Sequence, residues 1–352
     1  MHPYKNFPDT SFWSRAVAKG WMTRDLVACA SPLLREEDLI MSAGSCFAAH
    51  MIPALEDAGF TYIRAEQRHP AFAHLEPDPL GYGNFSAAYG NIYTARQLLQ
   101  LVQRGLGLFH PVENRWPTAS GEIIDPFRPG LRFRARSDQE FELLQDQHLR
   151  KTIEAFRRAS VFVFTFGLTE AWVSARDGAV FPACPGTVAG AFDPAKHQFQ
   201  NFTVSQVVSD FIEFMSVVKT ANPSLRFVVT VSPVPLVATA TARHVLEANI
   251  HSKSVLRAAA GELAETCPDV AYFPAYEIIT GPQAPMDFFE EDRRSVSSRG
   301  VSEVMQALLF MCGKTEASIL EPQALALQVD KASMLSAVIS QAECDELMMD
   351  RR

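Results

Sequence analysis

Short apolar runs alternate with longer amphipathic segments along most of the chain. The apolar runs predict buried strands at residues 39–43, 60–63, 161–167, 227–233 and 270–274. Continuous runs of this kind are typical of parallel strands that are covered on both faces. Apolar positions at helical spacing predict helices at residues 46–58, 95–105, 137–159, 204–220, 243–265 and 301–312. This alternation predicts an α/β fold in which a doubly wound, flavodoxin-like parallel sheet is flanked by helices.

The same pattern predicts how the chain is divided. Residues 1–37 are polar and irregular, and we expect them to wrap over the body through five apolar anchors, Phe12, Trp13, Val17, Trp21 and Met22. Residues 38–312 are expected to form the α/β domain. Within it, the proline-rich and glycine-rich stretch 106–137 predicts an extended insertion or lid, and residues 177–202 are expected to be loop. Residues 313–352 are predicted to be a helical C-terminal tail.

Composition narrows the class of protein. Of the 352 residues, 47% are hydrophobic and 20% are charged, which is typical of a globular protein with a sizeable core. The formal net charge of −8 argues against a nucleic-acid partner, since no basic block is present to neutralise phosphates. No apolar run is long enough to span a membrane, and the first residues lack the apolar core of a signal peptide. We therefore expect a cytoplasmic protein; the sequence indicates no oligomeric state.

The cysteines predict neither a disulfide framework nor a metal site. They are scattered along the chain without a Cys-x-x-Cys pair or a zinc-like histidine spacing, at Cys29, Cys46, Cys184, Cys267, Cys312 and Cys344. Such usage suits a reducing compartment. We expect no metal and no cofactor.

One junction between a strand and a helix stands out chemically. The apolar run 39–43 breaks at Gly44, and Ser45 follows directly before a helical pattern that carries Phe47 on its apolar face. A serine at such a corner is lifted out of the sheet, where its hydroxyl can attack an acyl carbon and its backbone N–H can face the developing oxyanion. The alternative is that Ser45 only caps the helix, a role that serine fills well.

The residues around this corner resemble a known family. Residues 44–48 read Gly-Ser-Cys-Phe-Ala, the motif that names the GSCFA family, a branch of the SGNH-hydrolase-like esterases. Further landmarks that resemble this family follow in order, at residues 90–94, 165–172, 230–234, 252–253 and 272–278. The resemblance implies an SGNH-hydrolase-like fold and a serine-dependent ester chemistry without a cofactor.

The resemblance also implies roles for single residues. Ser45 would be the nucleophile, and Gly90, with Asn91 beside it, would donate to the oxyanion. The third donor of the family falls on Thr169 instead of an asparagine, in a loop that also holds Gly167 and Glu170. Because the carboxyl ends of parallel strands meet at one edge of a sheet, we expect these loops to lie close together.

The expected general base is the clearest departure from the family. The family pattern Asp-x-x-His falls on Asp292 to Ser295, so a serine stands where the histidine should be. A serine hydroxyl cannot act as a general base near neutral pH. In one interpretation another histidine supplies the base, with His244 and His251 as candidates and His74 as a weaker one.

Reaction without a histidine and binding without reaction are the alternatives. In the first, the reaction would need only an orienting carboxylate, from Asp292 or Glu170, and its efficiency would be reduced. In the second, the protein would bind a glycan or acyl ligand without catalysis. For Glu170 a structural ion pair with Arg293 or Arg294 is the alternative to a role in the site.

We therefore expect an esterase that acts on a small acyl ester, with an acetyl ester of a carbohydrate as the substrate. The alternatives are an intracellular O-acyltransferase of bacterial surface-polysaccharide synthesis and a catalytically impaired binding protein.

Overall fold

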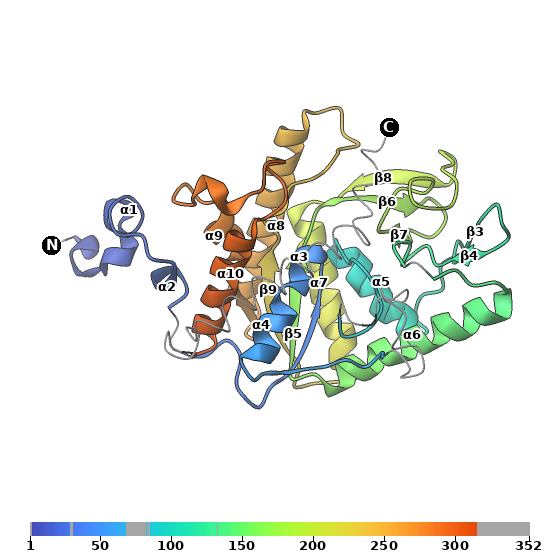
Figure 1. Cartoon of the computed structure of the whole chain (residues 1–352), viewed down its shortest axis with the longest axis horizontal. Coiled ribbons are helices and arrows are strands. Elements are labelled where there is room, and N and C mark those ends of the chain that lie inside the picture. Colours follow the sequence, from blue (N-terminus) through green and yellow to red (C-terminus); the bar gives the residue numbers. More distant parts are fainter. Residues whose placement is uncertain (1, 29–30, 68–81, 83–84, 132, 315–352) are drawn as a thin grey trace.

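A five-stranded parallel sheet forms the centre of the part of the chain that the structure describes (Figure 1). The structure is a computed structural model, and it describes residues 2–28, 31–67, 82, 85–131 and 133–314. All neighbouring strands of this sheet are parallel. The strands are β1 (Leu39–Ala43), β2 (Thr61–Tyr62), β5 (Val161–Phe166), β9 (Arg226–Val231) and β10 (Val270–Tyr272).

The order of the strands confirms the predicted doubly wound fold. Across the sheet they run β2-β1-β5-β9-β10, which is the flavodoxin-like order in which the chain winds outward in both directions. The winding direction changes between β1 and β5, whose register pairs Ala43 with Phe164. In open sheets of this kind, ligands bind beyond the carboxyl ends of the strands at such a switch point. We therefore expect a binding site among the residues that follow β1 and β5.

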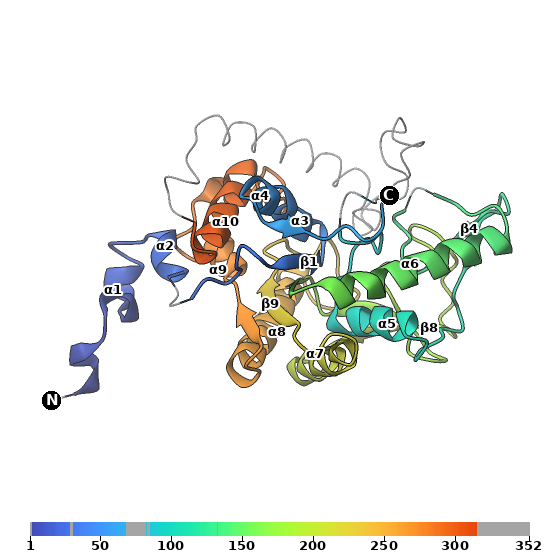
Figure 2. The same cartoon turned by 90° about the horizontal axis from the view of Figure 1, so that it is seen from below.

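Helices cover both faces of the sheet (Figure 2). One face carries α3 (Cys46–Ala49), α4 (Met51–Asp57) and α10 (Ser298–Met311). The other face carries α5 (Ala95–Gly105), α6 (Asp138–Arg158), α7 (Val204–Lys219) and α8 (Val245–Thr266). Thr94, Ser137 and Thr203 cap α5, α6 and α7 through their hydroxyls. These local signals explain why the predicted helices begin where they do.

Phenylalanines build the core beneath the switch point. Phe162, Phe164 and Phe166 alternate along β5, so all three side chains lie on one face of the sheet. They pack against Phe211 and Phe214 of α7, with ring centroids 5.5–6.0 Å apart where α7 meets β5. Each of these rings is fully buried, which stabilises the fold by about 2–3 kcal/mol a ring. This packing fixes the position of β5, the strand that leads to Gly167.

The prediction of loop at residues 177–202 is wrong in part. The stretch contains β7 (Val180–Phe181) and β8 (His197–Asn201), which pair with β6 (Glu170–Ser174) in an antiparallel sheet. In β8, polar glutamines alternate with Phe199, a pattern of half-exposed antiparallel strands that carries no continuous apolar run. A short helix, α9 (Ala275–Thr280), was likewise not predicted, and the helix expected at residues 46–58 is divided at His50 into α3 and α4.

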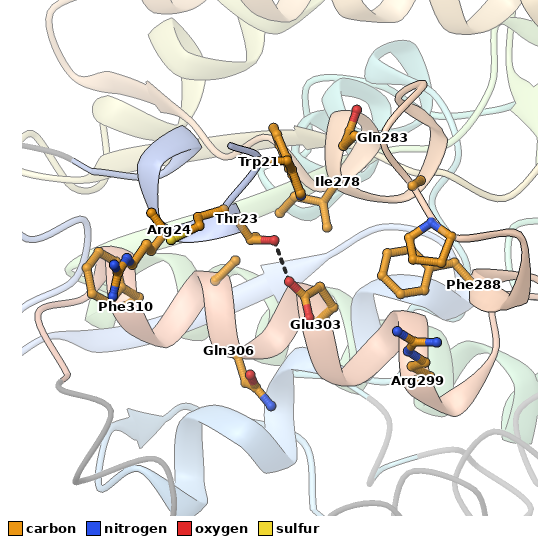
Figure 3. A pocket seen from close by; sticks show the side chains of 14 residues that line it. Trp21, Thr23, Arg24, Ile278, Gln283, Phe288, Arg299, Glu303, Gln306 and Phe310 are labelled. Atoms are coloured by element: carbon orange, nitrogen blue, oxygen red, sulfur yellow. Dashed lines mark hydrogen bonds between the residues drawn. The ribbon is translucent and has the colours of Figure 1, made fainter. Parts of the chain in front are cut away.

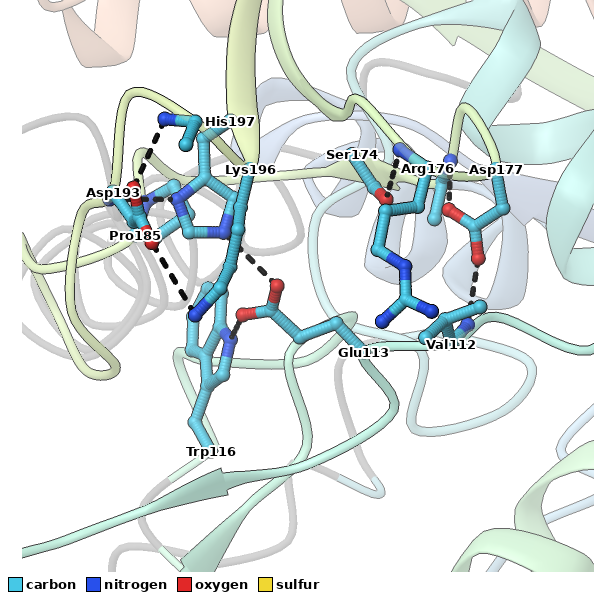
Figure 4. Close-up of polar contacts among 12 residues, drawn as sticks. Val112, Glu113, Trp116, Ser174, Arg176, Asp177, Pro185, Asp193, Lys196 and His197 are labelled. Atoms are coloured by element: carbon cyan, nitrogen blue, oxygen red, sulfur yellow. Dashed lines mark hydrogen bonds and ion pairs between the residues drawn. The ribbon is translucent and has the colours of Figure 1, made fainter.

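The insertion at residues 106–137 is fastened to this antiparallel sheet. It forms the hairpin β3 (Trp116–Pro117) and β4 (Ile123–Ile124), and Trp116 packs in a small apolar cluster with Phe181 of β7. Figure 4 shows Glu113 between Trp116 and His197: the indole N–H donates to Glu113 at 2.6 Å, and His197 Nε2 lies 3.0 Å from its other oxygen. Whether the insertion acts as a lid stays a prediction.

The N-terminal residues differ from the expected wrap. Residues 2–20 extend from the body in both views (Figures 1 and 2), through η1 (Pro3–Asn6), η2 (Asp9–Ser11) and α1 (Trp13–Ala16). Trp13 and Met22 are exposed at 65% and 44%, so the prediction that they anchor the segment is wrong. These helices are a single turn long, and helices this short are not stable on their own in water.

The attachment to the body comes later in the chain. After α2 (Thr23–Leu26), Val27, Leu33 and Leu34 are buried. The predicted helical tail falls almost entirely on residues 315–352, which lie outside the described residues. No helix in the described ranges is long and apolar enough to cross a membrane.

Candidate functional site

The corner after β1 is built around a glycine. Gly44 has a φ of +155°, and a Cβ atom placed on it would lie 2.8 Å from Cβ and 2.9 Å from the carbonyl oxygen of Thr165 in β5. Only glycine lets the two strands come this close at their carboxyl ends. Ser45 follows in an extended conformation, directly before α3. The switch point of the sheet therefore carries Ser45.

The Ser45 hydroxyl is buried and has no partner. Ser45 is 5% exposed, and its Oγ forms no hydrogen bond with any described residue. In particular, it does not accept a hydrogen bond from the first turn of α3, so the capping role that the sequence left open is not observed. A buried hydroxyl without a partner costs free energy, and such unsatisfied groups in a folded protein are often found at functional sites.

The loop of Gly90 and Asn91 lies beside this corner. The backbone N–H of Ile92 donates to the Gly44 carbonyl at 2.8 Å, which ties the loop to the residue before Ser45. Gly90 has a φ of +66°, a conformation that favours glycine. Asn91 is 5% exposed. The structure thus brings the expected oxyanion loop next to the expected nucleophile.

A glutamine of α5, which was not predicted from the sequence, holds this loop. The Gln97 side chain donates to the Asn91 carbonyl at 2.8 Å and accepts from the Tyr93 backbone N–H at 2.9 Å. Its own backbone N–H donates to the capping hydroxyl of Thr94. A glutamine three residues after a capping threonine is the sequence signal of a capping box, and it could have identified Gln97.

The loop after β5 completes a row of three adjacent segments. The backbone N–H groups of Gly167 and Leu168 donate to the Tyr93 carbonyl at 2.9 and 3.3 Å. From α8, the Lys253 ammonium donates to the Gly167 carbonyl at 2.6 Å, and Lys253 is only 1% exposed. The pair 252–253 was noted in the sequence only as a family landmark. Like Gln97, Lys253 makes a contact at this edge of the sheet that the sequence does not reveal.

Thr169 is placed differently from the expected third donor. It is fully buried, and its hydroxyl donates to Oδ1 of Asn201 in β8 at 2.6 Å. Its backbone N–H donates to Ser252 Oγ at 3.0 Å. A threonine hydroxyl has one hydrogen, and here the amide oxygen of Asn201 takes it. In this structure the Thr169 side chain therefore joins β8 to the loop after β5 and presents no donor to Ser45.

Glu170 holds the segment after β9. Its carboxylate accepts hydrogen bonds from the Thr239 hydroxyl at 2.7 Å and from the Ala240 backbone N–H at 3.1 Å. Within the described ranges, no ion pair joins Glu170 to Arg293 or Arg294. Glu170 thus has a structural partner, but a different one from the pair that the sequence suggested.

Asp292 and Ser295 form a closed turn of their own. One carboxylate oxygen of Asp292 accepts from the backbone N–H groups of Arg294 and Ser295 at 2.9 and 2.8 Å, and the other accepts from the Ser295 hydroxyl at 2.6 Å. Partial burial raises the pKa of the Asp292 carboxyl, but these hydrogen bonds outweigh it and hold the pKa below its ordinary value. The carboxylate is therefore ionised and already paired with the residue in the histidine position.

The histidines suggested as substitutes do not contact Ser45. His244 is exposed, and its Nδ1 accepts from the Leu246 backbone N–H at 3.2 Å at the start of α8. His251 is exposed on α8. His74 lies outside the described residues. No described histidine forms a hydrogen bond with Ser45, so the described residues bring the expected nucleophile together with two loops but with no base.

Two buried histidines elsewhere are committed to other partners. Nδ1 of His197 accepts from the Asp193 backbone N–H, so its hydrogen is on Nε2, which donates to Glu113. His148 lies on the buried face of α6, and its Nδ1 is 2.9 Å from Glu66. Neither contact involves the corner at Ser45.

The insertion closes over the Asn91 loop. Phe127, Arg128 and the three residues after them line a crevice of about 10 Å³ with Gly90 and Asn91, which is room for no more than about one water molecule. Arg128 donates to the Ala88 carbonyl at 3.2 Å and pairs with Asp125 at 2.9 Å.

Among the described residues, no group of three or more histidine, cysteine, aspartate or glutamate side chains is arranged to hold a metal ion.

Three comparisons with known proteins give the following. Residues 39–308 match the sequence model described as the GSCFA family. No curated protein matches the chain. A carbohydrate esterase family 3 structure from Talaromyces cellulolyticus is similar at 9% sequence identity, over 85% of this chain and 99% of that one, with a TM-score of 0.36. A likeness this weak bears on neither the fold nor the function of this chain.

Proposed function

The chain belongs to the GSCFA family, and from this premise we propose that it is a serine-dependent esterase of the SGNH type. Its substrate class is a small acyl ester, in the first instance an acetyl ester of a carbohydrate. The observation that carries the proposal is the state of Ser45. Its hydroxyl is buried without a partner, at the position where β1, β5 and the Asn91 loop meet.

The geometry supports a two-step acyl transfer. Ser45 Oγ attacks the acyl carbon, and its proton passes to the departing sugar oxygen, so that the acyl-serine forms and the sugar leaves with its hydroxyl restored. Water then attacks the acyl-serine and releases the carboxylic acid. The Ser45 backbone N–H and the Asn91 loop would stabilise the oxyanion in both steps. Gln97 acts through the loop, because it holds Asn91 and Tyr93 by their backbone.

A second candidate function rests on the turn at Asp292. The residue in the histidine position, Ser295, is already bonded to Asp292, and His244 and His251 are exposed. Loss of the base of a catalytic triad costs roughly 10⁴- to 10⁶-fold in rate. These contacts favour a protein that binds a glycan or acyl ligand and turns it over slowly or not at all.

The test separates the two functions by restoring the base. If the site is an esterase that lacks only its histidine, Ser295→His raises kcat/KM for p-nitrophenyl acetate by at least about tenfold, because Asp292 is in place to orient the imidazole. Ser295→Ala is the matched control, since it removes the same hydroxyl without adding a base. No gain in Ser295→His, together with saturable binding of an acetylated oligosaccharide by the wild type, favours the binding protein.

The products decide between hydrolysis and acyl transfer. An O-acyltransferase inside the cell would pass the acyl group from Ser45 to a sugar hydroxyl. With acetyl-CoA and a sugar acceptor, mass spectrometry would then detect an acetylated sugar. Our proposal expects free acetate only.

A further inference from the structure

We propose that Arg128 and Glu66 are positioning residues for the ester reaction. They bind the two backbone polar groups of Ala88 and thereby orient the Gly90 N–H for the oxyanion. Arg128 belongs to the insertion at residues 106–137, and Glu66 follows β2. The inference rests on the proposed function and adds to it, because it states how distant segments of the chain set the geometry of the Asn91 loop.

Gly90 depends on its neighbours for its orientation. Its φ is +66°, and a Cβ atom placed on it would meet no atom of the described residues within 4 Å. Among those residues, none accepts a hydrogen bond from the Gly90 N–H. Glycine is the residue with the greatest freedom in φ and ψ, so the direction of this N–H is set by the residues on either side. It is the N–H that the proposed function requires as a donor.

Ala88, two residues before Gly90, is bound through both of its backbone polar groups. Its N–H donates to Glu66 Oε2 at 2.9 Å, and its carbonyl accepts from Arg128 Nη1 at 3.2 Å. Ala88 is 2% exposed, so both bonds form away from bulk water, where hydrogen bonds to charged groups are strong. On the other side of Gly90 the loop is held by Gln97. The loop is thus fixed on both sides of the glycine.

Both side chains that bind Ala88 have buried partners of their own. Arg128 Nε donates to Asp125 at 2.9 Å. His148 Nδ1 lies 2.9 Å from the same Glu66 oxygen that accepts from Ala88. Burial raises the pKa of the Asp125 carboxyl, but nearby guanidinium groups, that of Arg128 first, outweigh burial and hold the pKa below its ordinary value. The carboxylate is therefore ionised, and Arg128 serves two partners at once.

The insertion is fixed in place directly before Arg128. The Phe127 ring stacks on Phe181 of β7, with ring centres 5.7 Å apart. The Arg104 guanidinium of α5 lies 3.9 Å from the centre of the Phe127 ring. Stability alone does not require the buried pair of Arg128 and Asp125, because apolar side chains of similar volume are often at least as stabilising. A planar guanidinium can donate to a carboxylate and a carbonyl together, which an apolar side chain cannot do.

Arg128→Lys tests the proposal while it preserves the charge. A lysine has one amine in place of the planar guanidinium, so it can pair with Asp125 but gives up the bond to the Ala88 carbonyl. We expect kcat for p-nitrophenyl acetate to fall about 10- to 100-fold, with KM within about threefold of the wild type, since the oxyanion forms in the transition state. A double variant, Arg128→Met with Asp125→Asn, removes both charges, keeps an acceptor for the Phe127 N–H and should show the same loss.

Two substitutions are matched controls. Arg115 lies in the same insertion and also pairs with carboxylates, those of Asp138 and Glu142 on α6. Figure 3 shows Glu303 of α10 in a groove of about 450 Å³ that is lined by no residue of the candidate site. In Arg115→Lys and in Glu303→Gln we expect kcat within about twofold of the wild type. Circular dichroism and urea unfolding check that every variant is folded.

Hydrogen exchange followed by mass spectrometry reports on the loop without any reaction. In Arg128→Lys, the peptide that contains residues 88–92 should exchange at least about tenfold faster than in the wild type. In Arg115→Lys it should exchange at the wild-type rate.

Three results overturn the proposal. The first is a normal kcat in every folded Arg128 variant of a protein whose wild type hydrolyses the ester, and the proposed function then stands. The second is unchanged exchange at residues 88–92 in Arg128→Lys. The third is a wild type that neither hydrolyses the ester nor reacts with a fluorophosphonate at Ser45, which overturns the proposed function as well.

Discussion

Gln97 offers the sharpest test of how the Asn91 loop is held. Its amide makes two hydrogen bonds to backbone groups of one loop, to the Asn91 carbonyl at 2.8 Å and from the Tyr93 N–H at 2.9 Å, and the residue is 6% exposed. Gln97→Leu keeps the size of the side chain and removes both bonds. The variant removes the Gln97 partner of one buried backbone donor and of one buried backbone acceptor.

The expected loss of stability follows from these two groups. A buried backbone group that loses its partner costs about 1–3 kcal/mol, and the leucine recovers part of that by burial, so the free energy of unfolding should fall by about 2–4 kcal/mol. The matched control is Gln103→Leu on the same helix. Gln103 donates to Glu213 at 2.9 Å on the exposed surface, and its loss should change stability by no more than about 0.5 kcal/mol.

Urea unfolding followed by circular dichroism measures both values. On the proposed function, Gln97→Leu should also lower kcat for ester hydrolysis by about 10- to 100-fold with a smaller change in KM, since the loop stabilises the transition state more than the substrate. If Gln97→Leu is no less stable than Gln103→Leu, the two hydrogen bonds of Gln97 do not stabilise the Asn91 loop. A normal kcat in a destabilised variant would show that the loop takes no part in the chemistry.

Three further predictions follow from single contacts. Gly44→Ala should destabilise the fold by about 3 kcal/mol, measured by urea unfolding, because its methyl group would lie 2.8 Å from Thr165 Cβ. Lys253→Met should cost about 1–3 kcal/mol in the same assay, because the buried Gly167 carbonyl loses a charged donor; unchanged stability would count against that bond. Burial lowers the pKa of His50 to about 4 from an ordinary 6.5, so the unfolded chain takes up a proton at a higher pH than the folded chain. Stability should therefore fall as the pH drops from 6.5 toward 4, by up to about 1.4 kcal/mol per pH unit, and His50→Gln should lack this part of the pH dependence in urea unfolding at pH 7 and pH 5.

Much of the fold is predictable because its signals are local. The strand Leu39–Ala43 and the helix Ala95–Gly105 have the predicted bounds, the first from an apolar run and the second from a capping threonine and its amphipathic pattern. The corner at Ser45 is local as well, since a glycine and a serine between a strand and a helix suffice to indicate it. Composition alone would not have identified this corner.

The parts that were missed depend on contacts between distant segments. Thr169 bonds to Asn201, which is 32 residues away on a strand with no apolar run, so no local pattern indicates that its hydroxyl is used. His244 and His251 were candidates by their place in the chain, and only the packing of α8 shows that both face outward. The N-terminal anchors failed for a similar reason, because apolar residue type alone does not say whether Trp13 packs on the body, and its side chain is 65% exposed.

The central claim is that Ser45 is a nucleophile. Incubation of the full-length protein with a fluorophosphonate probe, followed by peptide mapping by mass spectrometry, tests it most directly. The account predicts a single adduct on the peptide that contains Ser45, its absence in Ser45→Ala, and faster labelling in Ser295→His. An unmodified Ser45 in folded wild-type and Ser295→His protein at high probe concentration, or an adduct that persists in Ser45→Ala, would contradict it.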